Sequence, residues 1–139
     1  MIYLPERLEY IGKVCFYKSA LEQIRLPSAL RFIDAGAFCE CRNLKTINFP
    51  NGLEKIGLDA FMESGLENVE LPTSLRTIAQ GTFAKCESLK TVKFCEGLEA
   101  LGTDEYSDDG GLWYGIFQES SIESVELPST LKRIEYSTF

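Results

Sequence analysis

The side chains of this sequence that could do chemistry are thiols and carboxylates. The 139 residues include 21 Asp and Glu but no histidine. The absence of histidine removes Ser-His-Asp and Cys-His catalysis, histidine metal sites and histidine pH switches. The five cysteines are Cys15, Cys39, Cys41, Cys86 and Cys95. Any reaction would therefore depend on these thiols or on carboxylates alone.

The cysteines lack the neighbours that reactivity or metal binding requires. Cys39 and Cys41 form one Cys-x-Cys pair, and no second pair follows at the spacing of a zinc site. A cysteine nucleophile needs an activating base, and the usual base, histidine, is absent. The sequence therefore predicts small buried thiols, with no metal site and no catalytic residue.

The carboxylates and the net charge limit the function further. Catalysis by carboxylates needs two acids held rigidly across a cleft, and no glycine-rich phosphate loop is present. A net charge of −7 opposes binding to nucleic acid or to an anionic membrane. No apolar run approaches the ~18 residues of a membrane span. We therefore expect no enzyme, no cofactor, no nucleic-acid partner and no membrane insertion.

One sequence unit recurs along nearly the whole chain. Its first half is Leu-x-x-Ile-x-Leu-Pro, and its second half, Leu-x-x-Ile, leads to a phenylalanine. All five prolines occupy one position of the unit: Pro5, Pro27, Pro50, Pro72 and Pro128. Six of the nine phenylalanines close it: Phe16, Phe38, Phe61, Phe83, Phe117 and Phe139. Their spacing is 22, 23, 22, 34 and 22 residues, which indicates a repeat array.

The repeat predicts a stacked coil. A unit of 22–23 residues is too small to bury its own apolar side, so it must stack on its neighbours. The first half predicts a short strand, with Ile24 and Leu26 inward and Gln23 and Arg25 outward. Proline ends this strand because it has no amide hydrogen, and the second half would cross the back of the coil. Stacking then gives a parallel sheet on one face and a column of phenylalanines inside.

Charge signs alternate from unit to unit at two positions. One column is Glu22, Lys45, Glu67, Lys90 and Glu123, and the other is Glu9, Arg31, Glu54, Arg76, Glu99 and Lys132. Turns ~4.8 Å apart would bring opposite charges together, and a slip of one unit would stack like charges. We therefore expect a structural unit of two repeats, about 45 residues. Cys41 and Cys86, two repeats apart, would lie ~10 Å from each other, beyond the reach of a disulfide.

This unit resembles that of the BspA-like (Treponema pallidum-type) leucine-rich repeat family, which is close to Leu-x-x-Ile-x-Leu-Pro-x-x-Leu-x-x-Ile-Gly-x-x-Ala-Phe-x-x-Cys. The resemblance covers Leu4 to Phe139. It implies a β-rich α/β leucine-rich-repeat solenoid, a right-handed coil of about six repeats forming one domain over residues 1–139. It also implies a protein-binding or adhesive module at the cell surface or secreted, without shared catalytic residues. The chain begins without the basic start and apolar run of a signal peptide.

An insertion, residues 103–113, interrupts the pattern once before Tyr114. Aromatic and acidic side chains on a protruding loop suit contact with a protein partner. The candidate partner-binding residues are Tyr106, Asp108, Asp109, Trp113 and Tyr114. The alternative, which we favour, is a tolerated insertion whose Trp113 folds back onto the coil at little cost in stability. The aspartates lack the alternating spacing of a calcium-binding loop, so we expect no calcium site.

Two functions stay open. The first is non-catalytic binding of a protein, either on the sheet face or through the insertion. The outward columns of the expected strands are polar and lack aromatic anchors, which favours the insertion. The second is a structural spacer within a longer array, because the chain starts inside a repeat and stops on a repeat phenylalanine without a polar cap. Uncapped ends also predict end-to-end self-association.

Overall fold

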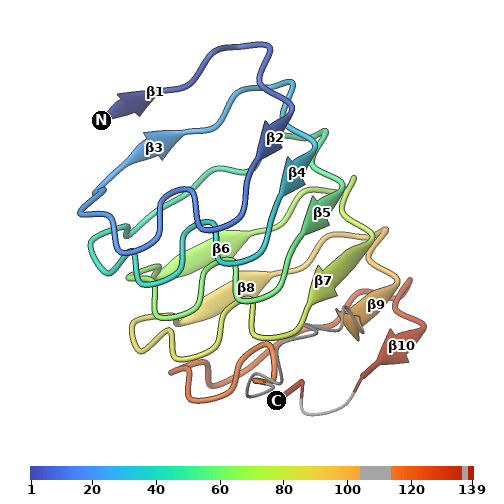
Figure 1. Ribbon diagram of the computed structural model, residues 1–139. Helices are drawn as coiled ribbons and strands as arrows, with labels where there is room; N and C mark the ends of the chain where they lie inside the picture. The colour runs from blue at the N-terminus through green and yellow to red at the C-terminus, as the bar shows by residue number, and fades with distance from the viewer. Residues whose placement is uncertain (104–113, 136–137) are drawn as a thin grey trace.

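The computed structural model describes residues 1–103, 114–135 and 138–139, which wind as successive turns of one coil (Figure 1). The strands of the described residues are β1 (Ile2–Tyr3), β2 (Tyr10–Ile11), β3 (Ile24–Arg25), β4 (Phe32–Ile33), β5 (Lys55–Ile56), β6 (Asn68–Glu70), β7 (Thr77–Ala79), β8 (Thr91–Lys93), β9 (Ala100–Thr103) and β10 (Arg133–Ile134). Every strand pair is parallel, so the predicted parallel solenoid is confirmed.

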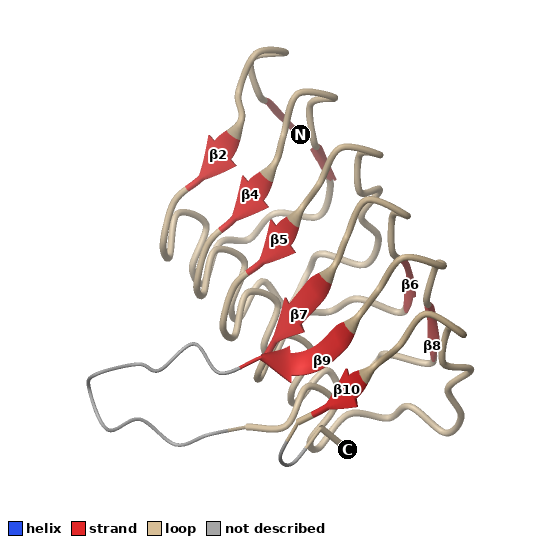
Figure 2. Cartoon of the chain, turned by 90° about the vertical axis from the view of Figure 1, so that its right-hand side faces the viewer, coloured by secondary structure: helices blue, strands red, loops and turns tan. Residues whose placement is uncertain are grey.

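The continuous sheet lies on the side that we expected to be the back of the coil. Its six strands, in the order β10-β9-β7-β5-β4-β2, come from the second half of each repeat (Figure 2). Among the described residues, the first halves, which we expected to form the sheet, pair only as β1 with β3 and β6 with β8. The proline that follows β1, β3 and β6 limits the length of these strands, because it has no amide hydrogen to continue the ladder.

The predicted β-rich solenoid is confirmed, but the described residues contain strands and turns and no helix, so the fold lacks the α component of the α/β description. The corner two residues after each repeat phenylalanine has a left-handed backbone, with φ between 54° and 57°. The residues at this corner are Lys18, Glu40, Glu63, Lys85 and Glu119. A residue in this conformation ends any helix, so each turn is closed by tight bends instead.

Backbone pairing continues around the corners between turns. The amide of Phe16 donates to the carbonyl of Ala37 at 2.8 Å, and the amide of Phe38 donates to that of Ala60 at 2.7 Å. The same bond joins Phe61 to Thr82 at 3.0 Å. Strands of two to four residues are therefore sufficient, because the turns on either side of them also share hydrogen bonds.

The column of phenylalanines predicted from the repeat is confirmed. Consecutive rings stack with centroids 5.1–6.0 Å apart from Phe16 to Phe139. The rings of Phe38, Phe61 and Phe83 are completely buried. Offset stacking of aromatic rings adds to the free energy gained by burying them, so this column is the axis of the core.

The alternating charges produce ion pairs in part. Lys132 lies 3.3 Å from Glu99, and Lys45 lies 3.9 Å from Glu67, both on the surface. Arg31 and Arg76 instead donate to backbone carbonyls of the following turn, those of Gly52 and Gly97. A column of small side chains, buried at Cys41, Ser64 and Cys86, also alternates with the period of two repeats: Ser19, Cys41, Ser64, Cys86 and Ser120. The Sγ atoms of Cys41 and Cys86 each donate to a carbonyl of an earlier turn, at 3.0 and 3.2 Å.

Candidate functional site

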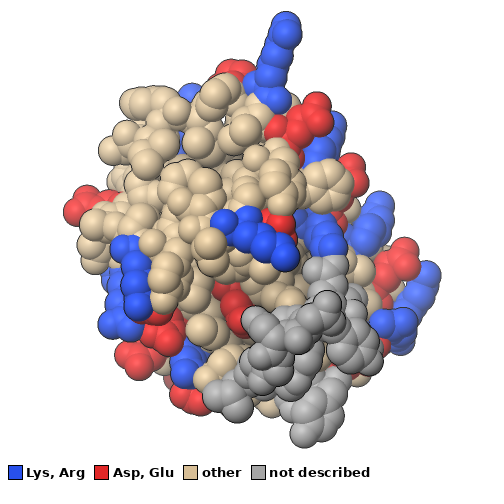
Figure 3. Space-filling model, in the orientation of Figure 1, with Lys and Arg blue, Asp and Glu red and all other residues tan. Residues whose placement is uncertain are grey.

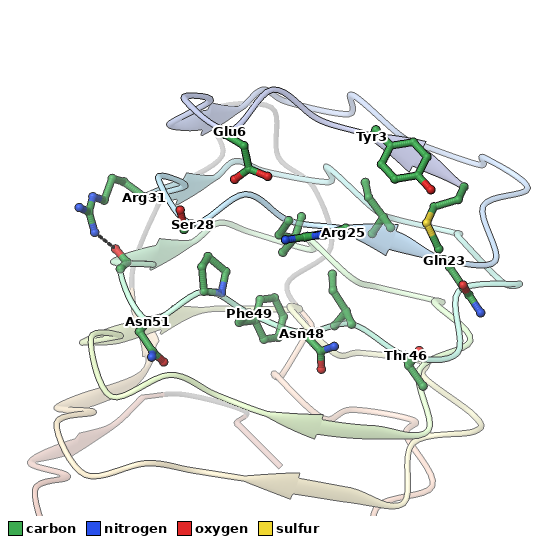
Figure 4. Close-up of a pocket in the computed structure, with 16 residues that line it drawn as sticks. Tyr3, Glu6, Gln23, Arg25, Ser28, Arg31, Thr46, Asn48, Phe49 and Asn51 are labelled. Carbon is green, nitrogen blue, oxygen red and sulfur yellow. Dashed lines mark hydrogen bonds between the residues drawn. The ribbon is translucent and has the colours of Figure 1, made fainter.

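A polar groove of about 990 Å³ runs along the face that carries β1 and β3 (Figure 4). We call it the groove. Its polar lining includes Gln23 and Arg25 on and beside β3, and Thr46 and Asn48 on the next turn. Tyr3 of β1 stands at one margin, and Phe49 lies at its floor (Figure 4).

Strand alternation directs these side chains into the groove. Ile24, Leu26 and Ile47 are buried, with 6–8% of their surface exposed. The residues between and beside them point outward, so Arg25 and Thr46 are exposed. The inward and outward positions predicted for this segment are therefore confirmed, although the segment contributes to a shorter ladder than we expected.

Four polar side chains along the middle of the groove have no partner among the described residues. No hydrogen bond or ion pair joins Gln23, Arg25, Thr46 or Asn48 to that part of the protein. The equivalent positions on the next two turns of the same face are paired with one another. Thr91 donates to Asn68 at 2.7 Å, and Lys93 donates to Glu70 at 2.6 Å, also as an ion pair.

The backbone under the groove is also unpaired. Between β3 and β6 the chain passes through residues 46–49 without strand structure. In the described part of the chain no backbone hydrogen bond involves the amides or carbonyls of these four residues. The groove therefore offers both main-chain and side-chain hydrogen-bonding groups to a ligand.

Two aromatic residues supplement the polar groups, and the sequence interpretation missed their role. Tyr3 is 78% exposed. Phe49 is half-buried, and its ring meets that of Phe61 edge to face at 5.6 Å and 80°. The missed signal was the match of Ile2-Tyr3-Leu4-Pro5 to Ile24-Arg25-Leu26-Pro27, which places Tyr3 on the same face as Arg25.

Charges of both signs are interspersed over the surface. Lysines and arginines lie beside aspartates and glutamates along the margin of the view in Figure 3. No group of three or more metal-ligating side chains occurs within the described residues. No described helix could cross a membrane.

The buried cysteines are poorly suited to nucleophilic chemistry. Burial, with the nearby carboxylates of Glu40 and Asp59, raises the pKa of the Cys39 thiol to about 12. Burial also raises the pKa of Cys41 and that of Cys86. A thiol with a raised pKa stays protonated near neutral pH and is a weak nucleophile.

Four of the five predicted partner-binding residues, Tyr106, Asp108, Asp109 and Trp113, lie outside the described residues. The fifth, Tyr114, is half-buried and contacts the preceding turn. Lys85 Nζ lies 4.6 Å from the centre of its ring and donates to its hydroxyl at 3.2 Å. This hydrogen bond raises the pKa of Lys85. Tyr114 thus fixes the point where the repeat resumes after the insertion.

Comparison with known proteins agrees with the repeat and the fold. The family described as BspA type leucine rich repeat region matches residues 9–139 in six copies. No curated protein matches the chain.

Three solved structures share its architecture. A leucine-rich repeat protein from Bacteroides ovatus is 26% identical, with a TM-score of 0.74 over 96% of this chain and 36% of that one. The Treponema pallidum leucine rich repeat protein is 28% identical, with a TM-score of 0.57 over 68% of this chain and 63% of that one. A leucine rich cell surface protein from Faecalibacterium prausnitzii shares the fold at 24% identity, with a TM-score of 0.60 over 95% and 40% of the two chains. This chain spans less than two thirds of each of them.

Proposed function

This chain belongs to the BspA-type leucine-rich-repeat family, and we propose that it is a non-catalytic module that binds a protein through the groove. The proposed partner segment is an extended peptide, which presents alternating backbone donors and acceptors along its length. The proposed role is adhesion or recognition outside the cell, at the surface or after secretion. The name of the Faecalibacterium relative, a leucine rich cell surface protein, supports this location.

One observation carries the proposal. The groove combines side chains at Gln23, Arg25, Thr46 and Asn48 with the backbone of residues 46–49, and neither set has a hydrogen-bond partner in the described part of the chain. On the neighbouring part of the same face, β6 and β8 satisfy each other. A peptide that enters the groove exchanges hydrogen bonds to water for hydrogen bonds to protein without breaking any intramolecular bond.

The side chains set the chemical preference of the groove. Arg25 favours an acidic side chain on the peptide, because a guanidinium can bind a carboxylate through two hydrogen bonds. Tyr3 supplies an exposed aromatic surface at one end, and aromatic residues are frequent energetic anchors at interfaces. We therefore expect the bound segment to carry an acidic residue and an apolar or aromatic residue.

Selection from a random-peptide phage library on the immobilised chain tests the proposal. Enriched peptides are then measured against a groove variant, Arg25→Ala with Asn48→Ala. The control is Lys90→Ala, which removes one exposed positive charge outside the groove. We expect the groove variant to bind about tenfold more weakly and the control to bind like the original chain. Failure to enrich any peptide, or equal binding by the groove variant, would contradict the proposal.

The insertion is a second candidate surface. Tyr106, Asp108, Asp109, Trp113 and Tyr114 retain the composition of a recognition loop. Deleting residues 104–113 from the chain separates the two surfaces. If the selected peptides bind equally well after the deletion, the groove is the site; if they are lost only on deletion, the insertion is.

The alternative function is a structural spacer in a longer array. One observation favours it: the chain spans 36–63% of the length of the solved relatives. A spacer of this kind would hold other parts at a distance and bind no peptide of its own. The selection experiment distinguishes it from the binding module.

A further inference from the structure

Asn51 and Gly52 form the tip of the turn that follows Pro50. The amide of Leu53 donates to the carbonyl of Pro50 at 3.1 Å, which closes the turn and leaves the two residues between them outside the strands. Asn51 is exposed at the margin of the groove (Figure 4). Its carboxamide makes no hydrogen bond with the described residues. This side chain can therefore rotate toward the backbone of its own turn.

The Gly52 amide nitrogen is the backbone atom that this carboxamide can reach most easily. Within the described residues it donates no hydrogen bond. Gly52 also has no side chain to obstruct the approach. This lack has a structural cause, because a Cβ there would lie 1.8 Å from Arg31 Nη1, which donates to the Gly52 carbonyl at 2.9 Å. The contact that holds the turn thus requires the residue type that leaves Asn51 with an unhindered neighbour.

The other three asparagines of the sequence lack this combination. Each precedes a bulky apolar residue, in the pairs Asn43-Leu44, Asn48-Phe49 and Asn68-Val69. Leu44 and Val69 are buried, and the Leu44 amide donates to the Cys41 carbonyl at 3.1 Å. The equivalent turn two repeats later keeps the arginine contact but reads Glu96-Gly97, so it has no carboxamide. Asn51 therefore differs from every comparable position in the sequence.

We propose that Asn51 is a site of spontaneous covalent modification, in which the Gly52 amide nitrogen displaces the side-chain amide of Asn51. The nitrogen loses its proton and bonds to Asn51 Cγ, the bond from Cγ to Nδ2 breaks, and ammonia leaves a succinimide ring. Water then adds to one of the two carbonyl carbons of the ring and breaks the bond from that carbon to the nitrogen. Opening at Cγ gives aspartate. Opening at the main-chain carbonyl carbon gives isoaspartate, whose backbone runs through Cβ and Cγ.

Both products add a negative charge at the margin of the groove, but they differ at the Arg31 contact. Aspartate leaves the backbone unchanged, so the Gly52 carbonyl stays within reach of Arg31. Isoaspartate adds an atom to the main chain between Pro50 and Gly52, which displaces the Gly52 carbonyl from Arg31 and the Leu53 amide from Pro50. The isoaspartate form therefore loosens the link between two turns. This inference holds or fails independently of what the groove binds.

Peptide mapping by mass spectrometry, during incubation of the chain in neutral buffer, tests the inference. Trypsin cleaves after Lys45 and Lys55 and releases residues 46–55, which contain both Asn48 and Asn51. We expect this peptide to gain about 1 Da at Asn51, while Asn48 stays unchanged. A synthetic peptide of residues 46–55 gives the rate in an unfolded chain. The folded chain should convert no more than about tenfold more slowly, because the turn leaves both reacting groups unpaired.

Asn51→Gln is the control and should show no gain over the same period, because its longer side chain closes a larger ring much more slowly. The isoaspartate form should melt at a lower temperature than Asn51→Gln and Asn51→Asp, which both keep the normal backbone. Conversion of another asparagine before Asn51, or a folded chain more than about tenfold slower than the peptide, would overturn the inference. An isoaspartate form that melts like Asn51→Asp would overturn the assigned effect on the Arg31 contact.

Discussion

Arg31 holds the backbone of the following turn at Gly52. Its Nη1 donates to the Gly52 carbonyl at 2.9 Å, and a Cβ on residue 52 would lie 1.8 Å from that nitrogen. The contact recurs 45 residues later, where Arg76 donates to the Gly97 carbonyl at 3.1 Å and a Cβ on residue 97 would lie 2.4 Å from its Nη1. Every second repeat therefore carries an arginine whose guanidinium fits against a glycine of the following turn. This contact, together with the ion pairs, distinguishes alternate repeats.

Replacing Gly52 with alanine should displace the Arg31 guanidinium. The expected loss is about 1 kcal/mol of unfolding free energy, the net value of one surface-accessible hydrogen bond. In an Arg31→Ala background the same replacement should cost almost nothing, because the clashing group is gone. Chemical denaturation of the four proteins measures this coupling. Equal losses in both backgrounds would mean that the two residues are independent.

Val14 occupies a left-handed backbone position, with φ of 49°. The equivalent positions of later turns hold Gly36, Asp59 and Gly81. A β-branched residue is strained there, so Val14→Gly should stabilise the protein by about 1 kcal/mol and raise its melting temperature by ~3 °C. The opposite change, Gly36→Ala, should destabilise it by a similar amount, since Gly36 has φ of 62°. Thermal unfolding of both variants measures the effect; a destabilised Val14→Gly would show that packing outweighs strain.

The middle of the phenylalanine column should be far more sensitive than its end. Phe61 stacks on both Phe38 and Phe83 and is fully buried. Phe61→Ala should therefore lower the free energy of unfolding by about 3–5 kcal/mol. If the alanine variant does not fold, Phe61→Leu should show a smaller loss that can still be measured. Phe139→Ala should lower the free energy of unfolding by less than about 1 kcal/mol, because that ring is mostly exposed. Similar losses at both positions would mean that the column is not the core.

The Tyr10 hydroxyl donates to the Asp34 carboxylate across the first two turns of the sheet. Partial burial acts to raise the pKa of Asp34, but the hydrogen bonds from Tyr10 and from the Ala35 amide outweigh it and lower the pKa. The hydrogen bond to Asp34 raises the pKa of Tyr10. Because the pKa of Asp34 is lower in the folded than in the unfolded protein, the contact stabilises the fold at pH values above the unfolded pKa, and this stabilisation is lost as the pH falls. Because the pKa of Tyr10 is raised, the contact stabilises the fold below about pH 10, and this stabilisation is lost as the pH rises.

The melting temperature of Tyr10→Phe should accordingly fall below that of the original protein near neutral pH. The difference should begin to shrink below about pH 4, where an aspartate of the unfolded chain becomes protonated, and disappear once the pH has fallen through the lowered pKa of Asp34 in the folded protein. It should shrink again in strong alkali. Tyr3→Phe is the matched control, because the Tyr3 hydroxyl makes no hydrogen bond with the described residues. A difference that stays constant from acid to alkali would contradict the assignment of the contact.

The recurring apolar positions were sufficient to predict the solenoid and its phenylalanine column, since a ring that returns every 22–23 residues must stack on itself. They were insufficient to predict which face carries the long sheet. Both halves of the repeat place apolar residues inward, and the choice depends on which amides remain free to pair. Arg31 was expected to pair with an acid, because the sequence does not show that a glycine carbonyl of the next turn lies nearer.

The groove was missed for a related reason. Its side chains were correctly placed on an outward polar face, but a polar column looks the same whether its members pair with one another or stay free. Asn68 and Thr91 are paired with each other, whereas Thr46 and Asn48 have no partner among the residues that the structure describes. That difference depends on how closely adjacent turns approach, which residue types alone do not determine.

Amide hydrogen exchange with and without a selected peptide tests the central claim, that the groove binds an extended chain. In the free protein the unpaired amides of residues 46–49 should exchange rapidly, and the β6–β8 ladder should be protected. When the peptide binds, residues 46–49 should become protected while β4 and β5 of the opposite sheet stay unchanged. Protection that leaves residues 46–49 unaffected, or that arises elsewhere on the coil, would contradict the account.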